Sequence, residues 1–121
     1  FNADGIIFAS PLGSTAYSLS AGGPIVAQDV DSIIITPVSP HSLSARPIVI
    51  NSDSEITITF PKLKNEIRIY ADGQTSKILD SNSKVKIKKS KISCKIIKPD
   101  NISSYYSKLR NKLRWFGEHR S

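Results

Sequence analysis

Glycine and hydroxyl residues are concentrated between positions 9 and 24, and this run carries the strongest chemical signal in the sequence. It follows an apolar, strand-like segment at residues 5–9. Ser14 and Thr15 stand where a helix N-cap belongs, and Gly22-Gly23-Pro24 ends the predicted helix about two turns later. A short helix that opens on hydroxyl residues presents free backbone N–H groups. Such a helix start suits the polar edge of a ligand, often a nucleotide.

Two further side chains near this run are candidates to contact the same ligand. Asp4, just before the strand, is either a turn aspartate or a carboxylate that accepts hydrogen bonds from an amide or a ribose hydroxyl. The short spacing from Asp4 to Thr15 favours the second role, because a strand–loop–helix unit can bring both to one crevice. Tyr17 is either a core aromatic or a wall on which a flat heterocycle stacks.

Other patterns that carry chemistry are weak in this chain. The glycines match neither a Walker P-loop nor the dinucleotide fingerprint Gly-x-Gly-x-x-Gly. A triad of His41, a serine and Asp53 is easily assembled by chance in so serine-rich a sequence, and nothing fixes its geometry. One cysteine and two distant histidines offer no metal-ligand spacing. Cys94 alternates with isoleucines, which predicts a buried thiol.

Short apolar or alternating runs predict about seven strands. They cover residues 5–9, 33–36, 47–50, 55–60, 66–70, 84–88 and 91–97. Pro37 is expected to end the second strand, and Asp72-Gly73 signals a hairpin turn. The frequent turns, without a repeated strand–helix rhythm, predict an all-β fold: a β-sandwich of many short strands with one short helix after the first strand.

The C-terminal end of the chain has a different pattern. Four large apolar residues step by four, four and three positions, as on one face of a helix. They are Tyr105, Leu109, Leu113 and Phe116. We therefore predict a β-sandwich domain at residues 1–100 and a C-terminal helical tail at residues 101–121. The tail is expected to fold back on this domain or to dock on a part of the protein that lies outside the sequence.

Length and composition set the broad class. The 121 residues suffice for one compact domain that buries roughly two-thirds of its unfolded surface. The chain begins at Phe1 and contains no Met, which predicts that it is part of a longer protein. A single cysteine excludes an internal disulfide and indicates a reducing compartment, and no apolar stretch approaches the roughly 18 residues of a membrane span. We therefore expect a cytoplasmic protein without a membrane partner.

The net charge of +7 is unevenly distributed along the chain. Residues 1–60 carry a net charge of −4, whereas residues 61–121 carry +11. A basic half can bind nucleic acid or another anionic surface. Lys84, Lys86 and Lys88, however, alternate with apolar residues as on a solvated strand face, and no aromatic residues are interleaved for base stacking. We expect no nucleic-acid partner.

Three blocks of sequence resemble bacterial NAD kinases. They are Asp4-Gly5, the run from Ser10 to Pro24, and the run from Pro40 to Pro47. The resemblance is to the C-terminal domain of that family and is strongest over residues 4–60. It implies a β-sandwich whose chain end returns toward an N-terminal α/β domain. It also implies transfer of the γ-phosphoryl group of ATP to the 2′-hydroxyl of the adenosine ribose of NAD, with a divalent metal, Mg²⁺.

The same resemblance indicates which functional residues to expect in this chain and which in the rest of the enzyme. The family's catalytic base is an aspartate in a Gly-Gly-Asp-Gly motif of the N-terminal domain, and that motif does not occur in this sequence. No catalytic or metal-binding residue is therefore expected here, and residues 1–121 alone should be inactive. The family's NAD-binding positions fall on Asp4, Thr15, Ala16, Tyr17, Ser18, Leu19, Ser20 and Gln74. The chain departs from relatives at Leu12 and Asn2, where a small polar and a basic residue are frequent.

The family resemblance also implies binding partners, and two other functions remain as alternatives. The resemblance implies NAD and ATP as ligands and a homo-oligomer with the site near an interface. One rival is the equivalent domain of a lipid or diacylglycerol kinase, which shares the general fold. The hydroxyl-rich segment at residues 15–20 and Gln74 count against that rival. The second rival is a basic β-sandwich module that binds nucleic acid.

Overall fold

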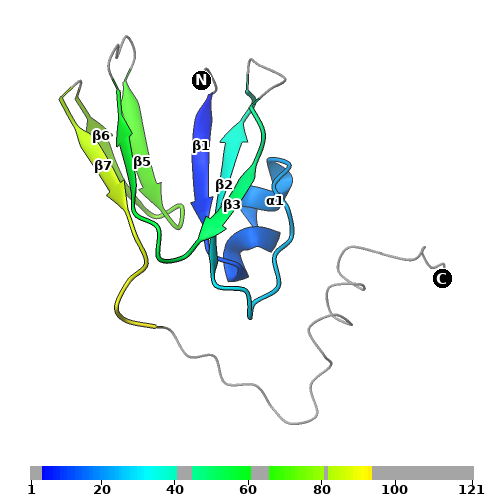
Figure 1. The fold of residues 1–121 in the computed structure, drawn as a ribbon. Helices are drawn as coiled ribbons and strands as arrows, with labels where there is room; N and C mark the ends of the chain where they lie inside the picture. Colours follow the sequence, from blue (N-terminus) through cyan, green and yellow to red (C-terminus); the bar gives the residue numbers. More distant parts are fainter. Residues whose placement is uncertain (1–3, 41–44, 61–65, 81, 94–121) are drawn as a thin grey trace. The chain divides into compact units, whose positions relative to one another are not determined.

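The computed structural model describes residues 4–40, 45–60, 66–80 and 82–93, which are mostly antiparallel strand (Figure 1). The elements, in chain order, are β1 (Gly5–Ala9), the 3₁₀ helix η1 (Leu12–Thr15), α1 (Tyr17–Ser20), β2 (Ser32–Val38), β3 (Ile48–Asn51), β4 (Ile56–Thr59), β5 (Ile67–Ala71), β6 (Thr75–Leu79) and β7 (Lys84–Ile87). The predicted all-β class is confirmed. All of these elements belong to the first of two compact units, residues 1–90.

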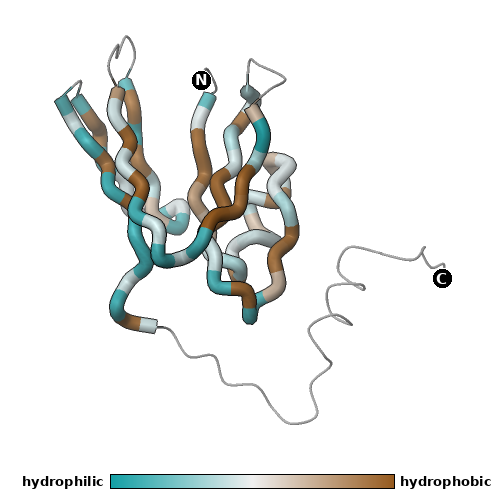
Figure 2. The backbone as a smooth tube through the Cα atoms, viewed as in Figure 1, coloured by the Kyte–Doolittle hydropathy of each residue, from teal (hydrophilic) through white to brown (hydrophobic). Residues whose placement is uncertain are grey.

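The first three strands form an antiparallel sheet with β2 in the centre. β1 pairs along β2 from Gly5 opposite Val38 to Ala9 opposite Ile34, and β3 pairs with residues 32–35 from the other edge. The central strand supplies more of the buried side chains than any other element, including Ile34, which is fully buried. Figure 2 shows the hydrophobic character of this sheet. The continuous apolar run in β2, rather than an alternation, is typical of a strand that is covered on both faces.

Pro37 lies inside β2, so the prediction that it ends the strand is wrong. It stands opposite Ile6 of β1, whereas the pairing between β2 and β3 stops at Ile35 opposite Ile48. In an antiparallel ladder every second residue turns its backbone N–H away from a given partner strand. Within the described ranges, no strand pairs with the edge of β2 away from β1 at Pro37, so the missing proline N–H breaks no ladder bond on that edge.

β4 and β7 form a two-stranded antiparallel sheet with the alternation that the sequence predicts. Ile56 and Ile58 of β4 are half-buried, and so are their partners on β7, whereas the intervening residues are exposed. The prediction that the lysines of β7 lie on a solvated face is therefore confirmed. The Nζ atom of Lys86 lies 3.1 Å from Oε1 of Glu55 at this exposed surface. Exposed pairs of this kind contribute little to stability.

β5 and β6 form a hairpin around the predicted turn. Asp72 and Gly73 both have positive φ angles, 53° and 71°, as a two-residue turn of type I′ requires. The backbone N–H of Gln74 donates to the carbonyl oxygen of Ala71 at 3.1 Å and closes the turn. The sequence signalled this turn, but β6 itself was not among the predicted strands. Its residues lack the clean alternation that marks β5.

The predicted tail and last strand lie mainly outside the described residues. The second compact unit, residues 91–121, is described only to residue 93, and residues 91–93 are not in a strand. The helix predicted from Tyr105 to Phe116 and the buried thiol of Cys94 both fall on undescribed positions, as does His41. The predicted boundary at residue 100 lies there too, and it stays a prediction.

The buried residues of the described chain include more hydroxyl side chains, five, than aliphatic ones, four. The buried aliphatic residues are Val26, Ile33, Ile34 and Leu79, and the buried hydroxyl residues are Ser14, Ser18, Ser32, Thr36 and Ser52. A buried hydroxyl group is costly unless it forms a hydrogen bond. Three of these five hydroxyl residues join the segment after β1 to its surroundings, and they define the candidate site.

Candidate functional site

The run between β1 and β2 folds as two short turns rather than one helix. η1 and α1 are each four residues long, and Ala16 between them breaks the helix with φ −99° and ψ −128°. The prediction of a single helix capped by Ser14 or Thr15 is wrong, because neither turn has a side-chain cap. Two amides that were expected to be free, those of Ser14 and Ala16, donate to carbonyl oxygens within η1 and its flanks.

Ser14 serves as an internal anchor instead of a cap. It is fully buried, and its Oγ donates to the carbonyl oxygen of Pro11 at 2.6 Å. The same oxygen accepts the backbone N–H of Val26 at 3.0 Å, twelve residues further along the chain. One side chain therefore fastens η1 to the return segment that leads into β2.

Ser18 is the second internal anchor, four residues after Ser14. It is 1% exposed, and its Oγ lies 3.0 Å from Oγ1 of Thr36, a fully buried residue of β2. Gly23 packs against this pair, since a Cβ atom at Gly23 would lie 2.5 Å from both hydroxyl oxygens. The family resemblance assigns Ser18 to NAD binding. In the structure its hydroxyl is directed to the sheet, so a side-chain contact to a ligand would have to compete with Thr36.

Tyr17 stands between the two anchors and is open to solvent. Its side chain is 65% exposed, so the interpretation of Tyr17 as a core aromatic is wrong. Ala16 and Ser20 are also exposed, and Thr15 and Leu19 are half-buried. Figure 1 shows α1 alongside the sheet rather than beyond the end of β1. The arrangement leaves an aromatic ring and adjacent polar groups available to a flat, polar ligand.

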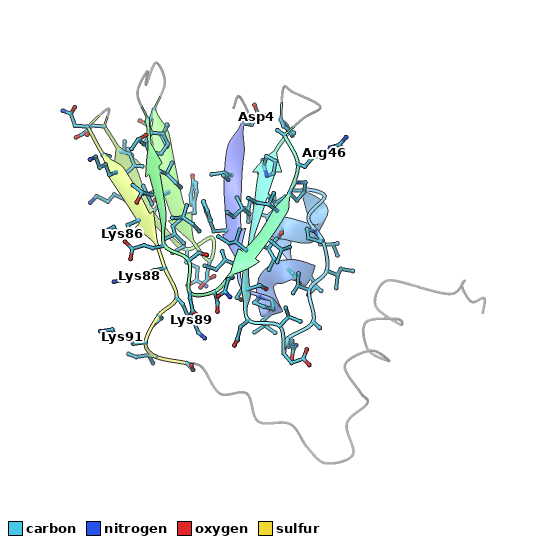
Figure 3. All side chains as sticks on the ribbon, in the orientation of Figure 1. Asp4, Arg46, Lys86, Lys88, Lys89 and Lys91 are labelled. Carbon is cyan, nitrogen blue, oxygen red and sulfur yellow. The ribbon has the colours of Figure 1, made fainter. Side chains whose placement is uncertain are left out.

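The other two predicted site residues lie on different elements. Asp4 is exposed at the start of β1, where its backbone N–H donates to the carbonyl oxygen of Val38 at 2.9 Å. Figure 3 shows Asp4 and Arg46 at the same end of the three-stranded sheet. Gln74 is exposed in the β5–β6 turn. Residues 15–20 lie on one segment of the structure. That Asp4 and Gln74 belong to the same binding site as this segment stays a prediction.

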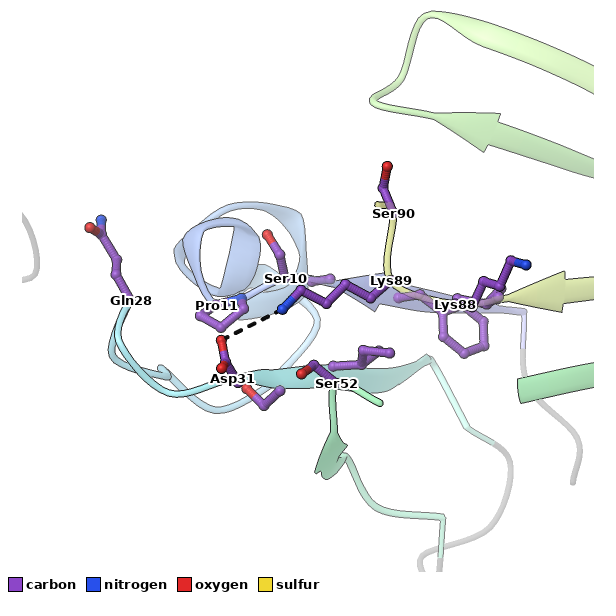
Figure 4. Close-up of a pocket in the computed structure, with 13 residues that line it drawn as sticks. Ser10, Pro11, Gln28, Asp31, Ser52, Lys88, Lys89 and Ser90 are labelled. Atoms are coloured by element: carbon purple, nitrogen blue, oxygen red, sulfur yellow. Dashed lines mark ion pairs between the residues drawn. The ribbon is translucent and has the colours of Figure 1, made fainter. Parts of the chain in front are cut away.

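A pocket of about 320 Å³ opens where β1 and β3 end and β2 begins (Figure 4). Ser10 and Pro11 of the glycine- and hydroxyl-rich run line it, whereas none of the eight predicted NAD-binding residues does. Nζ of Lys89 lies 4.0 Å from Oδ1 of Asp31 across this pocket, and both side chains are more than half exposed. This weak pair was not singled out from the sequence, because it joins residues 58 positions apart with no local pattern.

The described residues offer no group of three or more His, Cys, Asp and Glu side chains that would hold a metal ion. Within the same residues, no helix is long and apolar enough to cross a membrane.

The profile of the family described as ATP-NAD kinase C-terminal domain matches residues 1–99. The chain belongs to this family. As an ATP-NAD kinase C-terminal domain it is 45% identical over 115 residues to the NAD kinase of Fusobacterium nucleatum subsp. nucleatum, covering 95% of this chain and 43% of that protein. It is 46% identical over 111 residues to the NAD kinase of Methanosarcina acetivorans, covering 92% of this chain and 40% of that protein.

Two solved structures share the fold of this ATP-NAD kinase C-terminal domain. Yeast NADH kinase complexed with NADH has a TM-score of 0.79 at 30% identity, over 98% of this chain and 37% of the yeast chain. An NAD kinase from Archaeoglobus fulgidus in complex with ATP has a TM-score of 0.63 at 34% identity, over 74% of this chain and 33% of that chain. The chain thus spans less than half the length of the relatives it matches, and the predicted β-sandwich class is confirmed by the likeness in fold.

Proposed function

We propose that this chain is the NAD-binding part of an NAD kinase that transfers the γ-phosphoryl group of ATP to the 2′-hydroxyl of the adenosine ribose of NAD. The observation that carries the proposal is the family match over residues 1–99. The names of the relatives support it, as do the two similar structures, described as a complex with NADH and a complex with ATP. ATP binding and the homo-oligomer are proposed with it on the resemblance alone. The cytoplasmic location is proposed on the composition, and the absence of a nucleic-acid partner on the alternating pattern of Lys84, Lys86 and Lys88.

The residues of this chain would contribute binding and orientation. The exposed ring of Tyr17 offers a stacking surface for a heterocycle of NAD, and Thr15 and Ser20 offer hydroxyl groups beside it. Asp4 would accept hydrogen bonds from an amide or a ribose hydroxyl of the same ligand. Phosphoryl transfer depends on positioning and charge stabilisation more than on covalent chemistry from the protein. A ligand that is held on a rigid sheet satisfies the positioning requirement.

The proton acceptor and the metal belong to other parts of the proposed enzyme. No Gly-Gly-Asp-Gly motif occurs in residues 1–121, and the described residues have no metal-ligating group. When Mg²⁺ is bound with ATP, it neutralises charge on the phosphate oxygens. This chain then contributes the surface that holds the acceptor ribose.

Substrate profiling of the full-length protein tests this proposal. With ATP and Mg²⁺, we expect NAD or NADH to be phosphorylated and diacylglycerol to remain unmodified. Phosphorylation of diacylglycerol without any NADP product would support the lipid-kinase rival instead. Tight nucleic-acid binding with a steep dependence on salt concentration would support the binding-module rival.

A further inference from the structure

The segment that carries Tyr17 has little intrinsic stability. η1 and α1 are each four residues long, and helices of that length do not persist in water without tertiary contacts. None of the described buried aliphatic residues lies within residues 12–20. Leu19 of this segment is half-buried. Apolar burial is therefore a limited source of stability for the segment, and polar interactions must contribute to its conformation.

Two buried hydroxyl anchors supply those interactions, one on each side of the exposed residues. Ser14 joins the segment to the backbone of Val26, and Ser18 joins it to the side chain of Thr36 in the central strand. Between them the exposed fraction rises from 0% at Ser14 to 65% at Tyr17 and falls to 1% at Ser18. The chain leaves the protein interior and returns to it within four residues.

Thr36 is placed to fix this geometry without reaching a ligand. It is fully buried opposite Ile7 of β1, in the central strand of the three-stranded sheet. The Gly23 backbone closes over the Ser18–Thr36 pair and donates its N–H to the Ser18 carbonyl oxygen at 2.8 Å.

We propose that Ser14 and Thr36 are positioning residues for NAD, which hold the 15–17 segment in the orientation that presents Tyr17 to the ligand. This inference rests on the proposed function and adds two residues that the family resemblance did not place among the NAD-binding positions. Loss of either hydroxyl leaves a buried polar partner without a hydrogen bond. The segment should then sample other conformations, and NAD should bind more weakly because only a fraction of the molecules present the ring correctly.

The test uses three variants of the full-length protein. Thr36→Val removes the hydroxyl and keeps the shape, Thr36→Ser keeps the hydroxyl, and Ser32→Ala removes another buried hydroxyl of β2 that bonds to Val30 rather than to the segment. We expect Thr36→Val to raise the KM for NAD about five- to tenfold, as the loss of one buried hydrogen bond allows. The KM for ATP should stay within about twofold of the parent value. Thr36→Ser and Ser32→Ala should keep the parent KM for NAD.

Ser14→Ala is the corresponding test of the other anchor, and it should raise the KM for NAD at least as much because it also leaves the Val26 N–H unpaired. Thermal unfolding shows whether that variant still folds. If it does not fold, the Thr36 series alone decides the inference. A folded Thr36→Val protein with an unchanged KM for NAD would overturn it, and so would an equal rise in Ser32→Ala.

Hydrogen exchange separates failure of this inference from failure of the proposed function. In the ligand-free protein, Thr36→Val should speed amide exchange in residues 15–20 relative to the parent and to Ser32→Ala, whether or not the enzyme uses NAD. If the parent protein does not phosphorylate NAD, the proposed function is wrong, yet faster exchange would still support the anchoring role. Unchanged exchange in this segment would contradict the anchoring itself.

Discussion

At the scale of single residues, the structure separates side chains that face a ligand from side chains that hold the protein together. The sequence grouped Ser14, Ser18 and Tyr17 in one polar run, and it could not tell which of them are buried. The difference comes from partners that are distant in sequence, Val26 for Ser14 and Thr36 for Ser18. Residue type and spacing identified the polar segment after β1. Which of its side chains are anchors and which are exposed is determined by hydrogen bonds to residues distant in sequence.

Tyr17→Ala in the full-length protein should weaken NAD use and leave stability nearly unchanged. The ring is 65% exposed, so its loss should change the free energy of unfolding by no more than about 0.5 kcal/mol. A lost stacking contact of about 0.5–1.5 kcal/mol predicts a rise of roughly two- to tenfold in the KM for NAD. Tyr17→Phe is the matched control and should retain most of the affinity. An unchanged KM for NAD in Tyr17→Ala would show that the pocket assignment is wrong.

Asp4→Asn should raise the KM for NAD by about tenfold, because the carboxylate would lose its charge toward a ligand amide or hydroxyl. The backbone bond from Asp4 to Val38 does not involve the side chain and should persist. Asp53→Asn, which changes another exposed carboxylate in the turn after β3, is the control and should leave steady-state kinetics unaltered. Equal kinetics in Asp4→Asn and the parent would remove Asp4 from the site.

At the scale of elements, the clearest predictions were those with strong local patterns. The alternation in β4 and β7 and the Asp72-Gly73 turn are visible in the sequence because period-2 patterns and positive φ angles restrict residue type directly. The start and the capping of the helix after β1 and the end of β2 at Pro37 were predicted wrongly. Both depend on tertiary pairing. The segment after β1 follows its buried hydroxyl anchors, and within the described residues the pairing of β2 with β3 stops before Pro37, so the strand tolerates the missing N–H.

Gly23→Ala should destabilise the domain through the contact between the 15–20 segment and β2. The new Cβ would lie 2.5 Å from both Ser18 Oγ and Thr36 Oγ1, within a buried cluster that has little room to move. We expect the free energy of unfolding to fall by about 1–3 kcal/mol, the usual cost of overpacking. Denaturant unfolding of the full-length protein measures it. Gly13→Ala, whose Cβ would meet its neighbours at 3.7 Å or more, should cost clearly less; equal losses would contradict the packing argument.

Replacing Lys84, Lys86 and Lys88 together by glutamine should change stability little, since exposed substitutions usually stay within about ±0.5 kcal/mol each. All three residues are exposed in the structure. NAD kinase activity should persist in this triple variant. Tight nucleic-acid binding by the parent protein, lost in the variant, would overturn the interpretation of this strand as a solvated face and favour the nucleic-acid-binding rival.

At the scale of the whole molecule, this chain corresponds to less than half of its relatives. It covers 43% of the Fusobacterium nucleatum protein and 40% of the Methanosarcina acetivorans protein. Several large hydrophobic side chains of the described residues are also exposed, among them Ile48 at 51% and Val49 at 46% on β3. The motifs in the sequence were enough to predict the family. How the rest of the protein is arranged around this domain could not be predicted from these 121 residues.

Residues 1–121 alone should show no kinase activity, because the expected catalytic aspartate lies outside them. The assay is ATP-dependent conversion of NAD to NADP by the purified polypeptide, with the full-length protein as the positive control. Circular dichroism of the polypeptide shows whether it is folded under the assay conditions. Measurable NADP formation by residues 1–121 would contradict the proposal that the catalytic base lies in another part of the enzyme.

The central claim is that NAD binds on the exposed segment after β1, and hydrogen exchange of the full-length protein with and without NAD tests it most directly. We predict that saturating NAD slows amide exchange in residues 15–20 and around Asp4, and that Tyr17→Ala reduces this protection. Protection confined to the pocket that Ser10, Asp31 and Lys89 line would place the ligand elsewhere. Saturating NAD that leaves residues 15–20 unprotected would contradict the account.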